Sequence, residues 1–356
     1  MKASNSLRYN TINFETFGNA VNILNWKAEW PSNNPRQKAL TISLLQCLTI
    51  LSVLIWAMYL RLSDQQSNLK SKIVFLLRTA FQPVISIAWF YYLSHSYLRQ
   101  AALSDVSLLD AIHRPFYDRN NSPYQRLALL RNHYKLNYQL LGKNLATNLF
   151  FGETLNISEF TGKNQQTYRL ALFWGQSYKR EGGLTLGLFL QDTLIQCLTF
   201  SLDRHQQHVI IRVGGMQSHN ENTRELIRET TKNLHGIQPR LLLIDALRFI
   251  AQEIQCSTIE CIAKKNHIYE AWRYKFNKRI RAEYDNLWLL AGASLRHNGN
   301  YLLPLSAEEK PLDSRPSNKR SEYRARDTIK QAIRHQIAQT ISPPAMPSEH
   351  KHYLPA

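Results

Sequence analysis

The chain has 356 residues, and at about 150 residues per domain this length allows two compact domains or one large core with terminal additions. Hydrophobic residues make up 44% and charged residues 20%, which excludes a wholly disordered, collagen-like or coiled-coil protein. The 44 Lys and Arg residues outnumber the 26 Asp and Glu residues and give a net charge of +18, which favours polyanionic partners such as nucleic acid, anionic lipid or a phosphate-bearing cofactor.

The cysteines form no Cys-x-x-Cys pair, and no Cys/His set has the spacing of zinc ligands. We therefore expect free thiols in a reducing compartment and no bound metal. The residues concerned are Cys47, Cys197, Cys256 and Cys261.

Residues 39–60 form a run of 22 residues without a charge, between Lys38 and Arg61. About 20 apolar residues suffice to cross a bilayer, so this run is either a membrane helix or a helix buried in the protein core, and hydropathy does not separate the two. Basic residues flank both ends, so the positive-inside rule gives no orientation. We expect a cytoplasmic protein, either free or attached to the inner membrane through residues 39–60.

The first 150 residues are predicted to be mostly helical. Residues 79–98 form a low-charge run with Pro83 near its start, where proline is tolerated in a helix. Residues 103–149 have apolar side chains at helical spacings, and the turn-forming residues of 113–123 interrupt them. The pattern therefore predicts helices up to Gly152, where the period changes.

Beyond Gly152 the apolar residues alternate or run over strand lengths. Strands are predicted at 168–176, 184–192, 194–203 and 208–215. A helix capped near Ser218 and ended by Gly236 follows, then a second helix that opens at Pro239, and then a strand at 257–263. The order is thus a meander of strands, a strand ending in glycines, two helices and a further strand.

This order resembles the acyl-CoA-binding arrangement of the GNAT-like acyltransferases, in which a central strand leads into a pyrophosphate loop, a helix and a splayed strand. The resemblance implies an α+β fold, with a helical N-terminal region packed on a GNAT-like mixed β-sheet with flanking helices. A strand end followed by a helix start offers backbone N–H groups and a helix dipole to a pyrophosphate. The residues that the resemblance assigns to an acyl-CoA donor are Arg212, Gly214, Gly215, Gln217 and Ser218. The alternative interpretation of the two glycines is a bulge or turn.

A series of short segments between about Arg78 and Arg326 is similar to the VirK/YbjX family of Gram-negative bacterial proteins. The segments include HRPFY at 113–117, REG at 180–182, VGGMQ at 213–217, ETTKNLHGIQPR at 229–240, NHIY at 266–269, YDNLW at 284–288 and KRSEYRAR at 319–326. The resemblance implies a role in the envelope stress response, virulence or survival of cationic antimicrobial peptides, and it supplies no reaction.

Five parts of the chain are predicted from these patterns. They are an N-terminal extension at 1–72 that holds the helix 39–60, the helical part of the family region at 73–150, the GNAT-like sheet at 151–303, a basic helix at 304–340 and a disordered tail at 341–356.

Two residues are candidates for acid–base chemistry. Glu181 lies near a strand start beside glycines and is the best candidate for a general base, with a surface charge as the alternative. His235 comes before the helix-ending Gly236, where an imidazolium would interact favourably with the helix C-terminus, so capping is its alternative role. Family members commonly show Glu-Gly-Glu where this chain has Glu181, Gly182 and Gly183.

The densest basic stretch runs from Lys264 to Arg281, with aromatic residues among its charges. This pattern is typical either of a solvated helix whose aromatic side chains face the core or of a surface that stacks bases and contacts phosphates. Two functions therefore stay open. The first is an acyl-CoA-dependent acyltransferase-like protein. The alternative is a non-catalytic basic protein that binds an anionic membrane surface or, with less support, nucleic acid.

Overall fold

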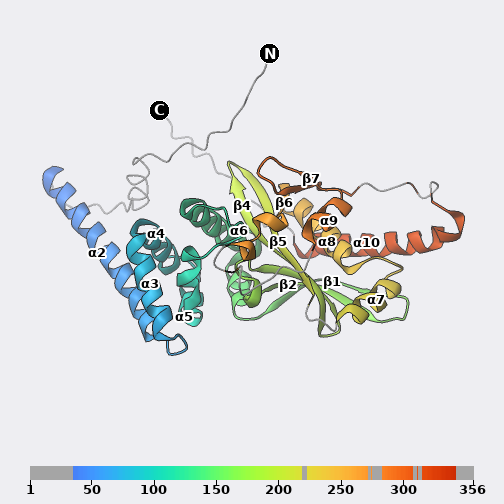
Figure 1. Ribbon diagram of the computed structural model, residues 1–356, viewed down its shortest axis with the longest axis horizontal. Coiled ribbons are helices and arrows are strands. Elements are labelled where there is room, and N and C mark those ends of the chain that lie inside the picture. The colour runs from blue at the N-terminus through green and yellow to red at the C-terminus, as the bar shows by residue number, and fades with distance from the viewer. Residues whose placement is uncertain are drawn as a thin grey trace, which may run out of the picture. The chain divides into compact units, whose positions relative to one another are not determined.

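The computed structural model describes residues 35–218, 223–271, 274, 283–307, 311 and 315–341. The chain divides into two compact units, Met1–Leu109 and Asp110–Ala356 (Figure 1). Of the segment predicted to be disordered, 341–356, the first residue, Ile341, is described and is buried. Residues 342–356 and much of the basic stretch 264–281 lie outside the described residues.

The first unit is helical, as the sequence predicts. Its helices are α2 (Pro35–Ser63), α3 (Leu69–Phe81), α4 (Pro83–Ser94) and α5 (Leu98–Ser104), followed by a 3₁₀ helix at Val106–His113. Residues 79–98 were expected to form one helix, but α3 and α4 meet at an angle of 110°. The break has a local cause, because the proline ring of Pro83 excludes Gln82 from helical backbone angles. Pro83 itself is the first residue of α4, where its missing N–H costs nothing.

Among the described residues, one helical segment is long and apolar enough to cross a membrane. It is Leu45–Ser63 within α2, and the bent pair α3 and α4 meets the same criteria if the two helices count as one span. The helix predicted over residues 39–60 is thus present, and α2 packs against both α3 and α4.

The second unit combines one sheet with several helices. Its strands are β1 (Thr154–Thr161), β2 (Thr167–Trp174), β3 (Leu184–Leu190), β4 (Thr193–His205), β5 (His208–Ser218), β6 (Cys256–Cys261), β7 (Ser294–Leu295) and β8 (Tyr301–Leu303). Its α-helices are α6 (Pro123–Phe150), α7 (Thr223–Asn233), α8 (Pro239–Glu253), α9 (Tyr284–Leu290) and α10 (Arg320–Thr340). The strand order is β1-β2-β3-β4-β5-β6-β8-β7, and β5 and β6 are its parallel pair. The protein is therefore α+β.

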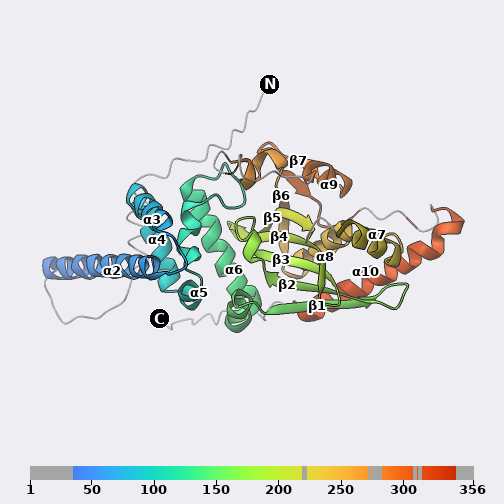
Figure 2. The same ribbon diagram turned by 60° about the horizontal axis from the view of Figure 1, so that its bottom comes forward.

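Helices cover the two faces of the sheet. Helix α6 packs on β4 and β2, whereas α8 packs on β3, β4 and β6 from the other side (Figure 2). Helix α10 lies against β1 and α8. The basic helix predicted within 304–340 is α10, and Ile329, Ile333 and Ile337 recur every four residues and bury one face of it.

Strand β5 does not end at its glycines. It continues through Gly214 and Gly215 to Ser218, and its pairing with β4 shifts register at this point, so the two glycines lie at a β-bulge within the strand. The parallel ladder with β6 stops at Val213 and Cys261. The two strands therefore separate just where the glycines lie.

Candidate functional site

Glu181 lies at the start of β3 and packs directly against the two glycines of β5. Its side chain is 0% exposed, so the alternative of a surface charge is wrong. A Cβ at Gly214 would overlap the carbonyl oxygen of Glu181, and a Cβ at Gly215 would overlap its carboxylate oxygen Oε2. Neither glycine has a positive φ, so close approach alone requires a glycine there. The REG and VGGMQ segments thus form one structural unit.

Polar side chains from three segments surround this carboxylate. Gln217 Nε2 donates a hydrogen bond of 2.6 Å to Glu181 Oε2, and the Tyr269 hydroxyl is hydrogen-bonded to the same carboxylate. His267 Nε2 lies 3.9 Å from Glu181 Oε1, and the Tyr284 hydroxyl lies beside Gly215. The Glu181 cluster consists of Glu181, Gln217, His267, Tyr269 and Tyr284.

Burial keeps the partners of Glu181 neutral. It lowers the pKa of His267 to about 4, so the approach of His267 to Glu181 is not an ion pair at neutral pH. Burial and then the negative charge of Glu181 raise the pKa of Tyr269 and of Tyr284 above the usual range, so both hydroxyls stay protonated. Tyr269 is partly exposed, whereas the Glu181 side chain that it contacts is fully buried.

Cys197 of β4 adjoins the same cluster. Burial, followed by the charge of Glu181, raises the pKa of this thiol to about 12. Burial also raises the pKa of the neighbouring Tyr178 hydroxyl to about 12. A thiol with this pKa is protonated at neutral pH and is a poor nucleophile. The chemistry of the cluster therefore centres on the carboxylate.

Residues 117–119, at and just after the end of the HRPFY segment, form hydrogen bonds to both chain segments that carry Glu181 and His267. The Tyr117 backbone N–H donates to the Arg180 carbonyl at 2.8 Å, and Arg119 N–H donates to the Asn266 carbonyl at 2.9 Å. Tyr117 is buried with a φ of +61°, an uncommon conformation for an aromatic residue. This short segment therefore sets the distance between the two sides of the cluster.

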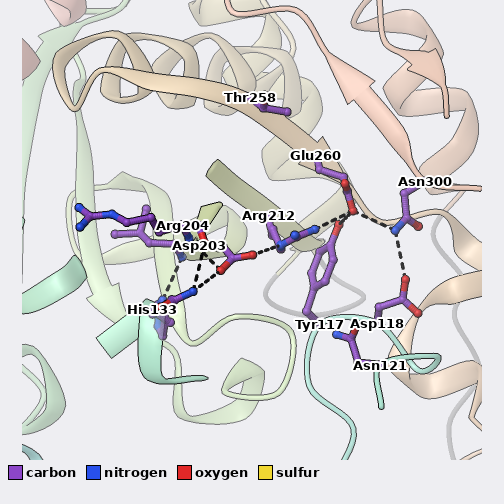
Figure 3. A network of polar contacts seen from close by, with 12 residues as sticks. Tyr117, Asp118, Asn121, His133, Asp203, Arg204, Arg212, Thr258, Glu260 and Asn300 are labelled. Carbon is purple, nitrogen blue, oxygen red and sulfur yellow. Dashed lines mark hydrogen bonds and ion pairs between the residues drawn. The ribbon is translucent and has the colours of Figure 1, made fainter. Parts of the chain in front are cut away.

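Arg212 belongs to a second buried group, the Arg212 network (Figure 3). Its Nε donates to Asp203 Oδ2 of β4 at 2.8 Å, and its Nη1 donates to Glu260 Oε1 of β6 at 3.0 Å. Glu260 also accepts from the Tyr117 hydroxyl and from Asn300 Nδ2. The guanidinium expected to meet an acyl-CoA donor is thus held by two carboxylates, and a donor contact from Arg212 stays a prediction.

His235 and Ser218 lie outside the Glu181 cluster. His235 follows α7 with a φ of +54°, and its carbonyl accepts a hydrogen bond from Arg326 Nε of α10. Partial burial and then the charge of Lys163 lower the pKa of His235, which disfavours the imidazolium expected at this helix end. Ser218 is the exposed last residue of β5. The structure therefore brings together Glu181, Gly214, Gly215 and Gln217, and leaves His235 apart.

Gly183 stands where members of the resembled family commonly have a second Glu, and its surroundings explain why a glycine fits there. Gly183 has a φ of +83°, and a Cβ there would overlap the ring of Trp174. The indole of this chain thus occupies the space that a side chain at Gly183 would need.

Of the tyrosines of the cluster, Tyr269 lies in the basic stretch 264–281, for which the sequence indicated other roles. The described part of the basic stretch forms two 3₁₀ turns, Lys264–Asn266 and Ile268–Glu270, rather than a helix. Tyr269 contacts Glu181, and Tyr274 accepts a hydrogen bond from Arg180, so both rings face the site. The signal that could have found Tyr269 and Tyr284 is their place in the NHIY and YDNLW segments.

Residues 64–339 match the model of the family described as "Protein of unknown function (DUF535)". The chain belongs to this family. It is 30% identical over 269 residues to "Uncharacterized protein YbjX" of Escherichia coli, covering 74% of this chain and 81% of that protein. It is 26% identical over 212 residues to an "Uncharacterized protein" of Haemophilus influenzae, covering 59% of this chain and 69% of that protein. No solved structure matches. The resemblance to the VirK/YbjX family is thereby confirmed, and the matched region contains the whole Glu181 cluster.

Proposed function

We propose that this DUF535 protein is an acyltransferase-like enzyme in which Glu181 accepts the proton of an amine or hydroxyl that attacks a thioester donor such as acyl-CoA. The observation that carries the proposal is a buried carboxylate, bonded by Gln217 and Tyr269, at the point where the parallel strands β5 and β6 separate. In sheets with parallel strands, ligands bind outside the carboxyl ends of the strands. Buried ionisable groups at such a position are candidates for catalysis.

The topology supports the same class of reaction. Strands β1 to β5 form an antiparallel run, and α7 and α8 then lead to β6, which returns parallel to β5. This order resembles the GNAT-like acyltransferases. Residues Gly214–Ser218 extend beyond the ladder with β6, and the side chains of His267 and Tyr284 lie at this edge. Groups that can bond a carbonyl oxygen therefore gather beside the carboxylate.

The proposed step needs only groups of the cluster and the two substrates. The acceptor gives its proton to the Glu181 carboxylate through the Tyr269 hydroxyl, and its nitrogen or oxygen forms a bond to the thioester carbonyl carbon. The carbon–sulfur bond then breaks, and the thiolate leaves and takes up a proton. Tyr269 suits a relay because its raised pKa keeps the hydroxyl protonated between transfers.

The test uses a series of acyl-CoA donors, from acetyl-CoA to palmitoyl-CoA, with amine and hydroxyl acceptors. The rate at which the full chain releases free thiol from each donor is measured. Glu181→Gln keeps the shape of the side chain but cannot take the proton, so turnover should fall by about 10²–10⁴-fold with donor affinity unchanged. Glu159→Gln is the matched control, because Glu159 is exposed and its hydrogen bonds are made by its backbone. A Glu181→Gln variant as fast as the wild type, or no turnover of any donor by the wild type, would rule out the proposal.

The alternative of a nucleic-acid-binding protein gains no support from the two described tyrosines of the basic stretch. Tyr269 and Tyr274, which one interpretation would have stack on bases, are bonded to Glu181 and Arg180. We further propose that the acceptor belongs to the cell envelope, since the VirK/YbjX family is linked with envelope stress, virulence and resistance to antimicrobial peptides.

A further inference from the structure

Helix α2 has its apolar side chains outside and its charge inside. Between residues 45 and 62 the exposed large side chains are all uncharged, and they recur every three or four residues along one face. They are Leu45, Leu48, Leu51, Ile55, Tyr59 and Leu62. A helix on the surface of a water-soluble protein carries charged and polar residues on this face. The exposed face of α2 is therefore not suited to water.

The opposite face of α2 is the packed one. Val53 and Ala57 are buried there, and Arg61 on the same face is only 4% exposed. The Arg61 guanidinium pairs with Asp64 at 3.1 Å and donates to Ser71 Oγ at 2.6 Å. Only 17% of the apolar window within Leu45–Ser63 is buried, so most of this stretch is not covered by the other described residues.

The bend between α3 and α4 adds a second exposed apolar surface to the same unit. Phe81, at the bend, is 82% exposed, and Leu77 and Val84 beside it are exposed as well. Helix α4 contains no charged residue. Contiguous apolar surface of this kind marks a site of interaction.

We propose that the first unit inserts α2, and the bend between α3 and α4, into the hydrocarbon of an anionic lipid bilayer. At about 1.5 Å per residue the 19 residues Leu45–Ser63 extend about 28 Å, close to the ~30 Å of a bilayer core. Arg36 and Lys38 precede this apolar stretch, and Lys70 and Lys72 follow it, so positive charges at both ends match anionic headgroups. A protein partner would call for a polar rim around the apolar patch, and the exposed face of α2 offers no charged side chain over this length.

The experiment is co-flotation of the full chain with vesicles of phosphatidylethanolamine and phosphatidylglycerol, in low salt and in 1 M NaCl. The test variant is Ile55→Asp, which places a charge in the middle of the exposed face. Ile55 is 59% exposed, so the change should leave the fold intact, and circular dichroism checks this. The matched control is Leu290→Asp, at another helical position that is 59% exposed but belongs to the second unit.

The wild type and Leu290→Asp should float with the vesicles in both salt conditions, because contact with acyl chains is not screened by salt. Ile55→Asp should bind about 100-fold more weakly, as expected for an acidic side chain in the hydrocarbon. Release of the wild type by 1 M NaCl alone would overturn the proposal, and so would full binding by Ile55→Asp. Failure of the wild type to float, together with a dimer that Ile55→Asp dissociates, would assign the face to a second copy of the chain instead.

Discussion

The two adjacent glycines of β5 meet different atoms of the same residue. A methyl group at Gly214 would strike the backbone carbonyl of Glu181, whereas one at Gly215 would strike its carboxylate. Replacing the side chain of Glu181 would remove the overlap with Gly215, because that overlap involves the carboxylate. It would not remove the overlap with Gly214, because that overlap involves the backbone carbonyl. The two positions therefore make a matched pair for a mutational test.

We predict that Gly214→Ala and Gly215→Ala each destabilise the protein by about 1–3 kcal/mol, the usual cost of overpacking. Adding Glu181→Ala should relieve the cost of Gly215→Ala and leave that of Gly214→Ala unchanged. Urea unfolding of the single and double variants of the full chain measures both coupling energies. Equal coupling at the two positions would show that the carboxylate does not pack against Gly215 as described.

Sequence reasoning at the residue scale found Glu181 as a carboxylate beside glycines at a strand start, and it found Gly214, Gly215 and Gln217 because a strand runs through glycines towards a helix. It missed Tyr269, because an aromatic residue among basic ones also suits a nucleic-acid surface. The contact between Tyr269 and Glu181 joins positions far apart in the chain, and periodicity carries no information about such pairs.

At the scale of elements, Arg212 joins three strands of the sheet. It bridges Asp203 of β4 and Glu260 of β6 from its place on β5 (Figure 3), so it ties the antiparallel strands to the parallel one. Both carboxylates are largely buried. Removing the guanidinium would leave two carboxylates close together without their cation.

We predict that Arg212→Met lowers the free energy of unfolding by about 3–5 kcal/mol, because breaking a buried ion pair leaves uncompensated charge. The control is Arg228→Met, since Arg228 and its partner Glu225 have side chains that are 64% and 59% exposed, and such surface pairs contribute little to stability. Urea unfolding of both variants gives the comparison. Equal effects of the two changes would mean that the Arg212 network does not hold the strands together.

Strands β2 to β6 and helices α7 and α8 were predicted close to their observed bounds, because each has a clear run or period of apolar residues. Strand β1 was missed because a bulge between Asn156 and Ser158 breaks its alternation. Strands β7 and β8 are two and three residues long, too short for a periodic signal. Local patterns also placed the end of β5 too early, since glycines within a strand look like a strand end.

At the scale of the whole molecule, the two units carry separate proposals. The first unit exposes an apolar face for lipid, and the second holds a buried carboxylate at separating strands. The structure divides the chain into these two units between residues 109 and 110. Sequence patterns carry no signal there, because residues on both sides of this position are helical.

In the proposed function, a thioester donor binds where β5 and β6 separate. The most direct measurement is amide hydrogen exchange of the full chain with and without saturating acetyl-CoA, a donor too short to bind through an acyl chain on α2. We predict slower exchange at residues 213–218 and 261–270, in the wild type and equally in Glu181→Gln, which should still bind the donor. Unchanged exchange in both segments at saturating acetyl-CoA, or protection confined to the first unit, would contradict the account.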